Sequence, residues 1–289
     1  MQNLVNVGCG MVAHPAWQNF DVEPRLSYVK RLDVRLGLPL SDGSADAVYS
    51  SHVVEHLSDT EAGAFFTDLW RVLAPGGVIR IVVPDLEHIC RIYLQQLDAL
   101  KGGTEKSDFV YRFALLELFD QSVRDHGGGE LLKFYKQARG VEAAYILQRH
   151  GPAVAAFLSE FIPQQQLPSA PKPLPKRTLR SMAKQVRWRL LVACCRVLGG
   201  SGAEEWLRIG RFRCAGEIHR TMYDEYRLLT VLRAHGFVDL RRVTAEYSSI
   251  ENFADFALDV VAGAIRKPDS IFFEARKPLK NVADALEAA

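Results

Sequence analysis

Apolar and polar residues alternate over several short stretches of the first 85 residues, which predicts β-strands. Val5 and Val7 alternate in a strand that ends at a glycine turn, and Trp17 to Phe20 forms a second strand that ends at Asp21. Three further strands are predicted at Val29 to Val34, Asp46 to Ser50 and Val78 to Val83. Strands that alternate with helical patterns indicate a parallel sheet with right-handed crossovers.

One helix is predicted before the last of these strands. Ser58 and Glu61 form the capping-box pattern S-x-x-E, which marks a helix start. Apolar residues follow at helical spacing until Pro75-Gly76-Gly77, which ends the helix.

The pattern becomes helical from about Leu86 to Gly216, and no convincing strand is found there. Helices are predicted at Phe109 to Arg124, Glu142 to Arg149 and Leu179 to Leu198, with a proline-rich extended linker at Pro163 to Pro175. The sheet pattern then resumes: a helix from Met222 to Leu232 precedes strands at Phe237 to Tyr247 and Ile271 to Ala275, around a short helical excursion near Asn252 to Leu258.

The chain is therefore predicted to be an α/β protein with a split sheet. Residues 1–85 and 217–278 form the sheet domain, residues 86–216 form a mainly helical insertion after the fifth strand, and residues 279–289 form a tail. We expect the insertion to cover the acceptor of whatever reaction the sheet domain supports, because specificity is set by what is added to such a fold.

Composition narrows the class of protein. The 289 residues are 48% hydrophobic and 24% charged, as in an ordinary globular protein, and the net charge of +2 indicates no polyanionic partner. The five cysteines form no C-x-x-C pair, which favours reduced thiols over disulfides or a zinc knuckle. With no signal-peptide pattern and no apolar run of about 18 residues, we expect a cytoplasmic protein.

The glycine turn and the acid after the second strand predict a ligand site. Gly8 and Gly10 allow the backbone to approach a ligand closely, and an acid in the position of Asp21 binds a ribose diol in doubly wound sheets. Too few residues separate Gly10 from the next strand for a full crossover helix, and a third glycine is missing. Anion binding at a helix N-terminus would therefore be weak, which argues against a dinucleotide.

Several stretches, in this order, resemble class I S-adenosylmethionine-dependent methyltransferases of the methyltransferase type 11 kind. They are NVGCG at 6–10, SSHVVEHL at 50–57, RVLAPGGVIRIVVPD at 71–85 and HRTMYDEYRLLTVLRAHGF at 219–237. The chain looks most like a predicted subgroup associated with polysaccharide and cell-envelope synthesis, although in the insertion only FDQSVR at 119–124 and GGGE at 127–130 are similar. The resemblance implies a Rossmann-like seven-stranded sheet with the last strand antiparallel and the donor across the ends of the first four strands.

The resemblance also implies which residues bind the donor, S-adenosylmethionine, whose product is S-adenosylhomocysteine. Asp21 would bind the ribose, Asp33 would lie beside the adenine amino group with Val34 against the ring, and Asn6 stands where the family usually has an acid. The full predicted set is Asn6, Gly8, Cys9, Gly10, Asp21, Val22, Asp33, Val34, Ser50 and Ser51. The missing third glycine matters little for a sulfonium donor, which carries no phosphate.

Catalytic residues are expected where the fourth and fifth strands end. His52 is the first choice as general base, because an imidazole can accept a hydroxyl proton near neutral pH; the alternative is a supporting, hydrogen-bonded residue. Asp85 and His219 are the other predicted catalytic residues. The predicted substrate-binding residues are Arg124, Arg220, Tyr223 and Asp224.

The run H-x-x-E-H leaves a metal site open as an alternative. It would place His52, Glu55 and His56 on one face of a helical turn. Some ubiquinone-pathway O-methyltransferases carry a related run that binds a divalent ion, whereas in many metal-free relatives the same residues only pack the turn. We predict no metal ligand here.

The stretch from Lys172 to Arg196 is basic, with no acidic residue and with Trp188 and leucines between the charges. A basic amphipathic helix of this kind is typical of contact with an anionic membrane surface. The alternatives are a helix packed on the domain with a solvated basic face and, less favoured, nucleic-acid binding, for which no aromatic platform is present. We therefore expect a peripheral membrane contact through 172–196 and no nucleic-acid partner.

Together these features predict a methyltransferase that modifies an oxygen of a glycan or cell-envelope precursor sugar. Two alternatives stay open. One is methylation of a small aromatic or lipid-like acceptor with help from a metal, and the other is a non-catalytic donor-binding scaffold in glycan assembly.

Overall fold

The computed structural model describes residues 2–105, 107–158, 179–200 and 202–279, with side chains from residue 186 onward in the third range. A seven-stranded sheet has the order β3-β2-β1-β4-β5-β9-β6. Its strands are β1 (Leu4–Val7), β2 (Gln18–Asp21), β3 (Val29–Arg31), β4 (Ala45–Ser51), β5 (Leu73–Pro84), β6 (Val238–Val243) and β9 (Ser270–Arg276). The first five are parallel to one another, and β9 runs antiparallel to both β5 and β6. The predicted sheet, with its last strand antiparallel, is confirmed.

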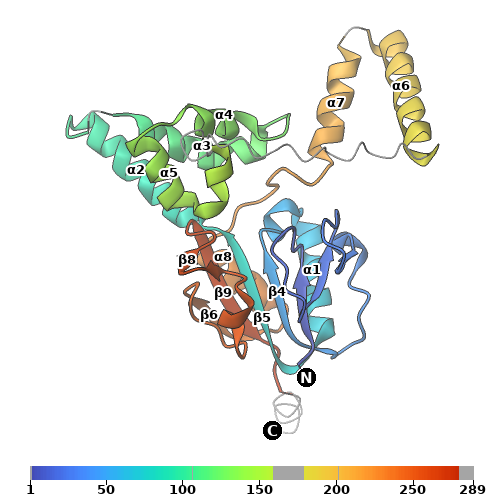
Figure 1. The fold of residues 1–289 in the computed structure, drawn as a ribbon, viewed down its shortest axis with the longest axis vertical. Coiled ribbons are helices and arrows are strands. Elements are labelled where there is room, and N and C mark those ends of the chain that lie inside the picture. Colours follow the sequence, from blue (N-terminus) through green and yellow to red (C-terminus); the bar gives the residue numbers. More distant parts are fainter. Residues whose placement is uncertain (1, 106, 159–178, 201, 280–289) are drawn as a thin grey trace.

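Eight α-helices lie between β4 and β6 in the described part of the chain (Figure 1). They are α1 (Asp59–Val72), α2 (Leu86–Lys101), α3 (Phe109–Val123), α4 (Gly129–Gln137), α5 (Val141–His150), α6 (Leu179–Gly199), α7 (Ala203–Arg213) and α8 (Glu225–Ala234). Short 3₁₀ turns are η1 (Val34–Leu36), η2 (Val54–His56), η3 (Pro152–Phe157) and η4 (Phe253–Phe256), and β7 (Val260–Val261) pairs with β8 (Ala264–Ile265).

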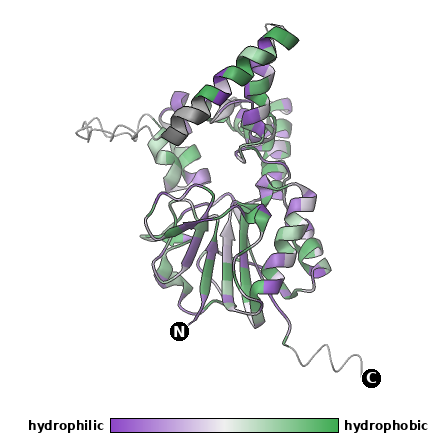
Figure 2. Cartoon of the chain, turned by 90° about the vertical axis from the view of Figure 1, so that its right-hand side faces the viewer, coloured by the Kyte–Doolittle hydropathy of each residue, from purple (hydrophilic) through white to green (hydrophobic). Residues whose placement is uncertain are grey.

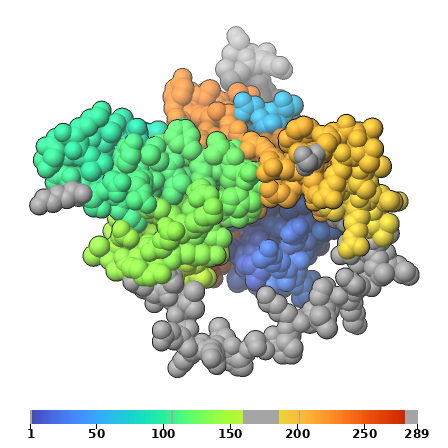
Figure 3. Space-filling view, turned by 90° about the horizontal axis from the view of Figure 1, so that it is seen from above, coloured from blue at the N-terminus to red at the C-terminus, as the bar shows by residue number. Residues whose placement is uncertain are grey.

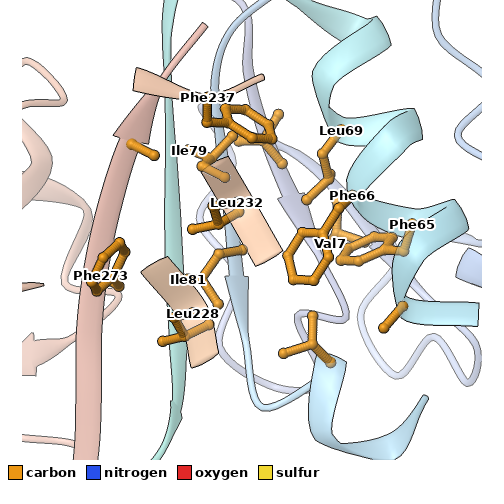
Figure 4. Packing of buried hydrophobic residues seen from close by; sticks show 14 of the residues in the cluster. Val7, Phe65, Phe66, Leu69, Ile79, Ile81, Leu228, Leu232, Phe237 and Phe273 are labelled. Carbon is orange, nitrogen blue, oxygen red and sulfur yellow. The ribbon is translucent and has the colours of Figure 1, made fainter. Parts of the chain in front are cut away.

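One face of the sheet is covered by helices α1 and α8. Phe65, Phe66 and Leu69 of α1 lie against the strands, beside Leu228 and Leu232 of α8 (Figure 4). The predicted capping box starts α1: Ser58 Oγ accepts from Glu61 N–H, and Glu61 Oε2 accepts from Ser58 N–H. This face is the larger apolar core of the sheet domain.

The opposite face is covered by a segment of the chain between β6 and β9. Ala245, Ile250, Phe253 and Leu258 of this segment pack with Trp17 against β4 and β5. Residues 8–17, between β1 and β2, form a loop rather than a crossover helix, as the short spacing predicted. Residues 244–265 therefore lie where a more regular α/β sheet would have helices.

A buried arginine holds this segment to the sheet. Arg80 of β5 is 0% exposed; it donates to Asp259 Oδ2 at 2.7 Å and to Glu274 Oε1 at 2.9 Å. It also donates to the backbone carbonyls of Thr244, Ala245 and Tyr247. Charge and hydrogen bonds from a single strand residue thus fix both ends of the covering segment.

The insertion has an apolar cluster of its own, separate from those of the sheet. Phe109 and Phe113 of α3 stack with Phe134 of α4, and Ile146 of α5 is fully buried among them. Later in the same insertion, the pair α6–α7 stands away from helices α2 to α5 and from the sheet (Figure 1), and in Figure 2 green and purple residues mix along α6. Seen from above, the insertion and this pair lie over the sheet domain, with N-terminal residues visible beside them (Figure 3).

Some predicted boundaries are wrong in detail. The third strand stops at Arg31 rather than Val34, because Asp33 caps the turn η1 through its side chain. The last helix begins at Glu225, after its cap Asp224, so His219 to Tyr223 form the segment leading into it. The predicted linker at 163–175 lies outside the described residues, as does the tail from residue 280.

Candidate active site

A cavity of about 440 Å³ lies at the carboxyl ends of β1 and β4. The β1–β2 loop, the end of β4, the stretch around β7 and β8 and the start of η3 contribute its walls. Six of the predicted site residues line it: Asn6, Gly8, Cys9, Gly10, Ser51 and His52. Because Pro152 and Ala153 also line it, the insertion takes part in the same cavity.

The backbone geometry of the turn after β1 requires glycine. Gly8 has φ +68°, and a Cβ on it would lie 2.2 Å from Val53 Cγ2, so the position leaves no room for a side chain. Gly10 has φ +54°, and its N–H donates to Asp21 Oδ2 at 2.8 Å. The acid at the end of β2 thus holds the turn after β1 in place.

Asn6 has an unused acceptor. Its side chain is 0% exposed, and its Nδ2 donates to Val12 O and Asn19 Oδ1, both at 3.0 Å. Its Oδ1 has no hydrogen-bond partner within the described protein. A buried acceptor without a partner is uncommon, so this oxygen beside the cavity is suited to a donor group of a ligand.

The two predicted nucleoside acids do not line the cavity. Asp21 accepts backbone N–H groups on both carboxylate oxygens, from Gly10 and Glu23. Asp33 binds the Arg35 guanidinium at 2.9 and 2.6 Å, and these bonds hold the pKa of Asp33 below its usual value. Their assignment to ribose and adenine stays a prediction, as does that of the neighbouring Val22 and Val34.

His52 lies at the cavity wall in a constrained conformation. Its φ of +55° is in the left-handed region, which is uncommon for a residue with a side chain and is often found at functional sites. Its Nδ1 lies 3.3 Å from Glu55 Oε1 and its Nε2 lies 2.9 Å from Ser270 Oγ. Burial, with a smaller effect of Lys267, holds the pKa of His52 well below its usual value, so the ring is neutral as a base must be.

Lys267 is a cavity residue that sequence patterns did not indicate. Its Nζ donates to Ser51 Oγ at 3.4 Å, and burial lowers its pKa. Arg266 and Asp259, from the same stretch, also line the cavity. No sequence motif surrounds these residues, and β6 and most of the covering segment lie between them and α8 in the chain. Only the fold therefore brings them to the cavity.

Asp85 lies outside the cavity lining and has structural partners. It is 2% exposed, caps α2 by accepting from His88 N–H at 2.9 Å and binds Arg242 Nη2 at 2.7 Å. Ser50 is buried as well, and its Oγ has no partner within the described protein. Neither residue lines the cavity, so the roles predicted for both stay predictions.

The predicted substrate residues are likewise away from the cavity lining. Arg124 lies 3.4 Å from Glu217 Oε1, Arg220 binds Glu61 Oε2 at 3.2 Å, and Asp224 caps α8. Tyr223 is 2% exposed, and its backbone forms an isolated bridge with Asp85. They lie where the insertion rejoins the sheet domain, and any contact with an acceptor stays a prediction.

The H-x-x-E-H run does not form the predicted common face. The turn η2 is a 3₁₀ turn, and Glu55 points toward His52 while His56 Nδ1 lies 3.0 Å from Ile218 O. The ring of His56 instead lies 4.9 Å from that of His219. Burial raises the pKa of Glu55 to about 8. His219 is therefore brought to the run by the fold, in the place that the pattern gave to His52.

Part of the chain is similar to known methyltransferases. Residues 6–81 match the profile of a family described as "Methyltransferase domain". A 59-residue stretch is 42% identical to a protein of Mycolicibacterium smegmatis named as a probable S-adenosylmethionine-dependent methyltransferase, covering 19% of this chain and 22% of that one. The chain thus spans about a fifth of the length of the curated relative that it matches. For residues 6–81, the family match confirms the predicted methyltransferase domain, and S-adenosylmethionine, which the relative's name gives as its donor, is the donor that the sequence predicts.

Solved structures with detectable similarity include other methyltransferases. One from Thermotoga maritima, titled a possible histamine N-methyltransferase, is 10% identical over 96% of this chain and 83% of that one, with a TM-score of 0.37. One from Archaeoglobus fulgidus is 11% identical over 96% and 86%, also with a TM-score of 0.37.

Among the residues that the structure describes, no helix is long and apolar enough to cross a membrane.

Proposed function

We propose that this protein transfers a methyl group from S-adenosylmethionine to a hydroxyl oxygen of a glycan or cell-envelope precursor sugar. The observation that carries the donor assignment is the cavity, whose lining includes Asn6, with a buried amide oxygen that has no partner within the described protein, and the partly buried Lys267. The donor has an amino-acid end with one ammonium and one carboxylate group. Asn6 Oδ1 would accept from the ammonium, and Lys267 Nζ would bind the carboxylate.

The chemistry is a single displacement. When bound, the donor supplies a sulfonium methyl group: the new C–O bond forms as the C–S bond breaks, and S-adenosylhomocysteine leaves with the sulfur electron pair. The protein's contribution is alignment, worth roughly 7–11 kcal/mol of the barrier, and removal of the hydroxyl proton. His52 is the proposed base, because it lines the cavity as a neutral imidazole.

The donor assignment makes a prediction about Lys267. Replacing it by methionine is expected to weaken S-adenosylhomocysteine binding roughly 10- to 150-fold, because a charge-assisted hydrogen bond contributes about 1.5–3 kcal/mol. Calorimetry measures this directly. Binding of 5′-methylthioadenosine, which has the nucleoside but no amino-acid end, should be unchanged.

A matched control is Lys133→Met, because Lys133 lies exposed on α4 in a pair with Glu130. It should affect neither ligand. Equal weakening of both ligands by Lys267→Met would mean that the lysine supports the fold rather than the carboxylate. A wild-type chain that binds no S-adenosylhomocysteine would end the proposed function itself.

A screen with labelled donor tests the proposed acceptor. We expect label to pass to lipid-linked glycans rather than to catechols or fatty acids, on the strength of the resemblance described above. Transfer of the label to a small aromatic acceptor would contradict the glycan acceptor and support methylation of a small aromatic or lipid-like molecule instead. Donor binding with no transfer to any class would favour a scaffold.

We also propose that α6 brings the enzyme to an anionic membrane, where a lipid-linked acceptor would lie. Val186 and Leu190 of α6 are 54% and 62% exposed, and Arg187 and Arg189 beside them are exposed as well. Apolar side chains with basic neighbours are the composition of a helix that lies in a membrane interface. The rest of the predicted contact, residues 172–178 and the side chains of 179–185, lies outside the described residues.

Reversing both charges, with Arg187→Glu and Arg189→Glu, is expected to lower vesicle affinity about 30-fold or more, since each basic group near the surface contributes about 1 kcal/mol. Flotation with vesicles of 30:70 phosphatidylglycerol to phosphatidylcholine measures it (roughly the charge density of anionic leaflets). The control pair Arg91→Glu and Arg112→Glu changes the net charge equally from α2 and α3 and should bind normally. A wild-type protein that stays unbound would rule out the membrane contact.

A further inference from the structure

Three side chains with metal-binding atoms meet between the sheet domain and the end of the insertion. Glu55 and His56 belong to η2, and His219 comes from the segment before α8. One ligand atom from each lies within 4.8 Å of the other two. The three residues are called the E-H-H cluster below.

Several buried oxygen and nitrogen atoms of the E-H-H cluster have no hydrogen-bond partner within the described protein, and a bound cation would give them a partner. Glu55 is 0% exposed, and neither of its carboxylate oxygens has a hydrogen bond within the described protein. The His52 Nδ1 lies 3.3 Å from one of them, outside hydrogen-bond geometry. His219 is 4% exposed, and its Nδ1 also has no partner. Buried polar atoms are normally satisfied, so several together at one point indicate a missing ligand.

The third residue is oriented as a ligand. His56 Nδ1 lies 3.0 Å from the carbonyl oxygen of Ile218. A carbonyl can only accept, so Nδ1 carries the proton and Nε2 has a free lone pair. Histidines that bind metals usually donate their other ring N–H to a carbonyl or carboxylate in this way, which fixes the ring and its tautomer.

We propose that Glu55, His56 and His219 bind one divalent first-row transition-metal ion, with Zn²⁺ as the reference ion. Two imidazoles with one carboxylate suit Zn²⁺ and its neighbours, whereas Mg²⁺ and Ca²⁺ prefer oxygen ligands alone. The assignment makes His219 a ligand instead of a catalytic residue, and it includes His56 while leaving His52 at the cavity. It goes beyond the proposed function and does not depend on it.

A second group of metal-binding side chains, Glu117, His150 and Asp269, is the competing location. There the carboxylate already has a cation: Arg149 Nε lies 3.1 Å from Glu117 Oε1. His150 is also engaged on both ring nitrogens, by Tyr135 OH at 2.6 Å and by Glu117 at 2.9 Å. An ion would have to displace these partners, so the E-H-H cluster is the better site.

The position of the E-H-H cluster implies what the ion does. The N–H groups of Arg220 and Thr221 donate to Glu55 O, and His219 N–H donates to Gln121 O on α3. An ion here would join η2, the segment before α8 and, through that segment, the insertion. Because it would bind the folded chain and not the unfolded one, it should raise the melting temperature.

The test uses the full chain, stripped with EDTA and dialysed, and titrated with Zn²⁺ by calorimetry. We expect about one ion per chain, a higher melting temperature with Zn²⁺, and no competition from millimolar Mg²⁺. Co²⁺ should give the visible absorption of a site with nitrogen ligands. His219→Gln and Glu55→Gln should each weaken Zn²⁺ binding more than about tenfold. The exposed His126, changed to Gln, should have no effect.

Three results would overturn the assignment: no Zn²⁺ bound by the wild type, unchanged binding in His219→Gln, or loss of binding in His150→Gln, which would move the ion to the other cluster. Circular dichroism of the metal-free variants checks that they are folded. S-adenosylhomocysteine binding is measured in parallel on the same samples. A chain that binds S-adenosylhomocysteine but no Zn²⁺ contradicts only the metal site. A chain that binds Zn²⁺ but no S-adenosylhomocysteine contradicts only the proposed function.

Discussion

Replacing Arg80 by methionine is expected to lower the free energy of unfolding by about 3–5 kcal/mol. The substitution keeps most of the apolar stem and removes the charge. It leaves Asp259 and Glu274, which are 3% and 1% exposed, without the cation between them. Three backbone carbonyls of the covering segment lose their donor at the same time. Breaking a buried ion pair from one side is costly because the other charge stays buried and uncompensated.

Urea unfolding measures this loss, and two variants make it interpretable. Arg91→Met removes an arginine that lies exposed on α2 beside Glu87, and it should change stability by no more than about 0.5 kcal/mol. Adding Asp259→Asn and Glu274→Gln to Arg80→Met removes the stranded charges and should recover part of the loss. If Arg80→Met were as stable as wild type, the covering segment would be held by its apolar contacts alone.

The same arginine links stability to the cavity at the ends of β1 and β4. Asp259 accepts from Arg80 on one oxygen and from Tyr49 OH at 2.5 Å on the other, and both Asp259 and Tyr49 line the cavity. Loss of Arg80 should therefore also weaken S-adenosylhomocysteine binding. Because Arg80 itself does not line the cavity, such weakening would come from movement of the wall.

The parts of the fold that depend on local sequence were predictable. The alternation at Val5 and Val7, the capping pair Ser58 and Glu61, and the short spacing after Gly10 each act over a few residues, and each is found as expected. The antiparallel strand was expected from the resemblance of several stretches, taken together in their order along the chain, to a family with that sheet. Local hydrogen bonding and side-chain alternation are short-range effects, so they are visible in the sequence.

The parts that depend on long-range contact were not predictable. Tyr49 and Asp259 are 210 positions apart, and nothing near either residue indicates the bond between them. Lys267 reaches the cavity because residues 244–265 fold back over one face of the sheet. That segment has one 3₁₀ turn, inside the helical excursion predicted near Asn252 to Leu258, and a hairpin of two-residue strands. These elements are too short to indicate how the segment packs on the sheet.

The H-x-x-E-H run shows why spacing alone assigned the wrong partner. The prediction assumed helical geometry, in which positions three and four apart share a face. In the structure His52 has a left-handed backbone conformation, outside the turn that starts at Val54, and so it faces the cavity. The residue that lies beside Glu55 and His56 is His219, far along the chain, and its backbone N–H donates one hydrogen bond to Gln121 O.

Replacing His52 by asparagine is expected to lower methyl transfer roughly 10²- to 10⁴-fold, which is the usual contribution of a general base. Asparagine is chosen because it tolerates the left-handed conformation that His52 adopts at φ +55°, so the end of β4 should keep its shape. The amide has no basic nitrogen. The affinity for S-adenosylhomocysteine should therefore stay within about twofold while the rate falls, because the proposed donor ligands do not include this ring.

The rate is measured with labelled donor and the acceptor that the screen identifies. Ser270→Ala is the matched control: it removes the hydroxyl 2.9 Å from His52 Nε2 but leaves the imidazole in place. If His52 is the base and Ser270 only orients it, the serine variant should lose far less activity than His52→Asn. Equal losses would mean that the pair acts as one unit. Full activity in His52→Asn would show that another group takes the proton. Lys267 would be the next residue to test, because it is partly buried, lines the same cavity and has a lowered pKa.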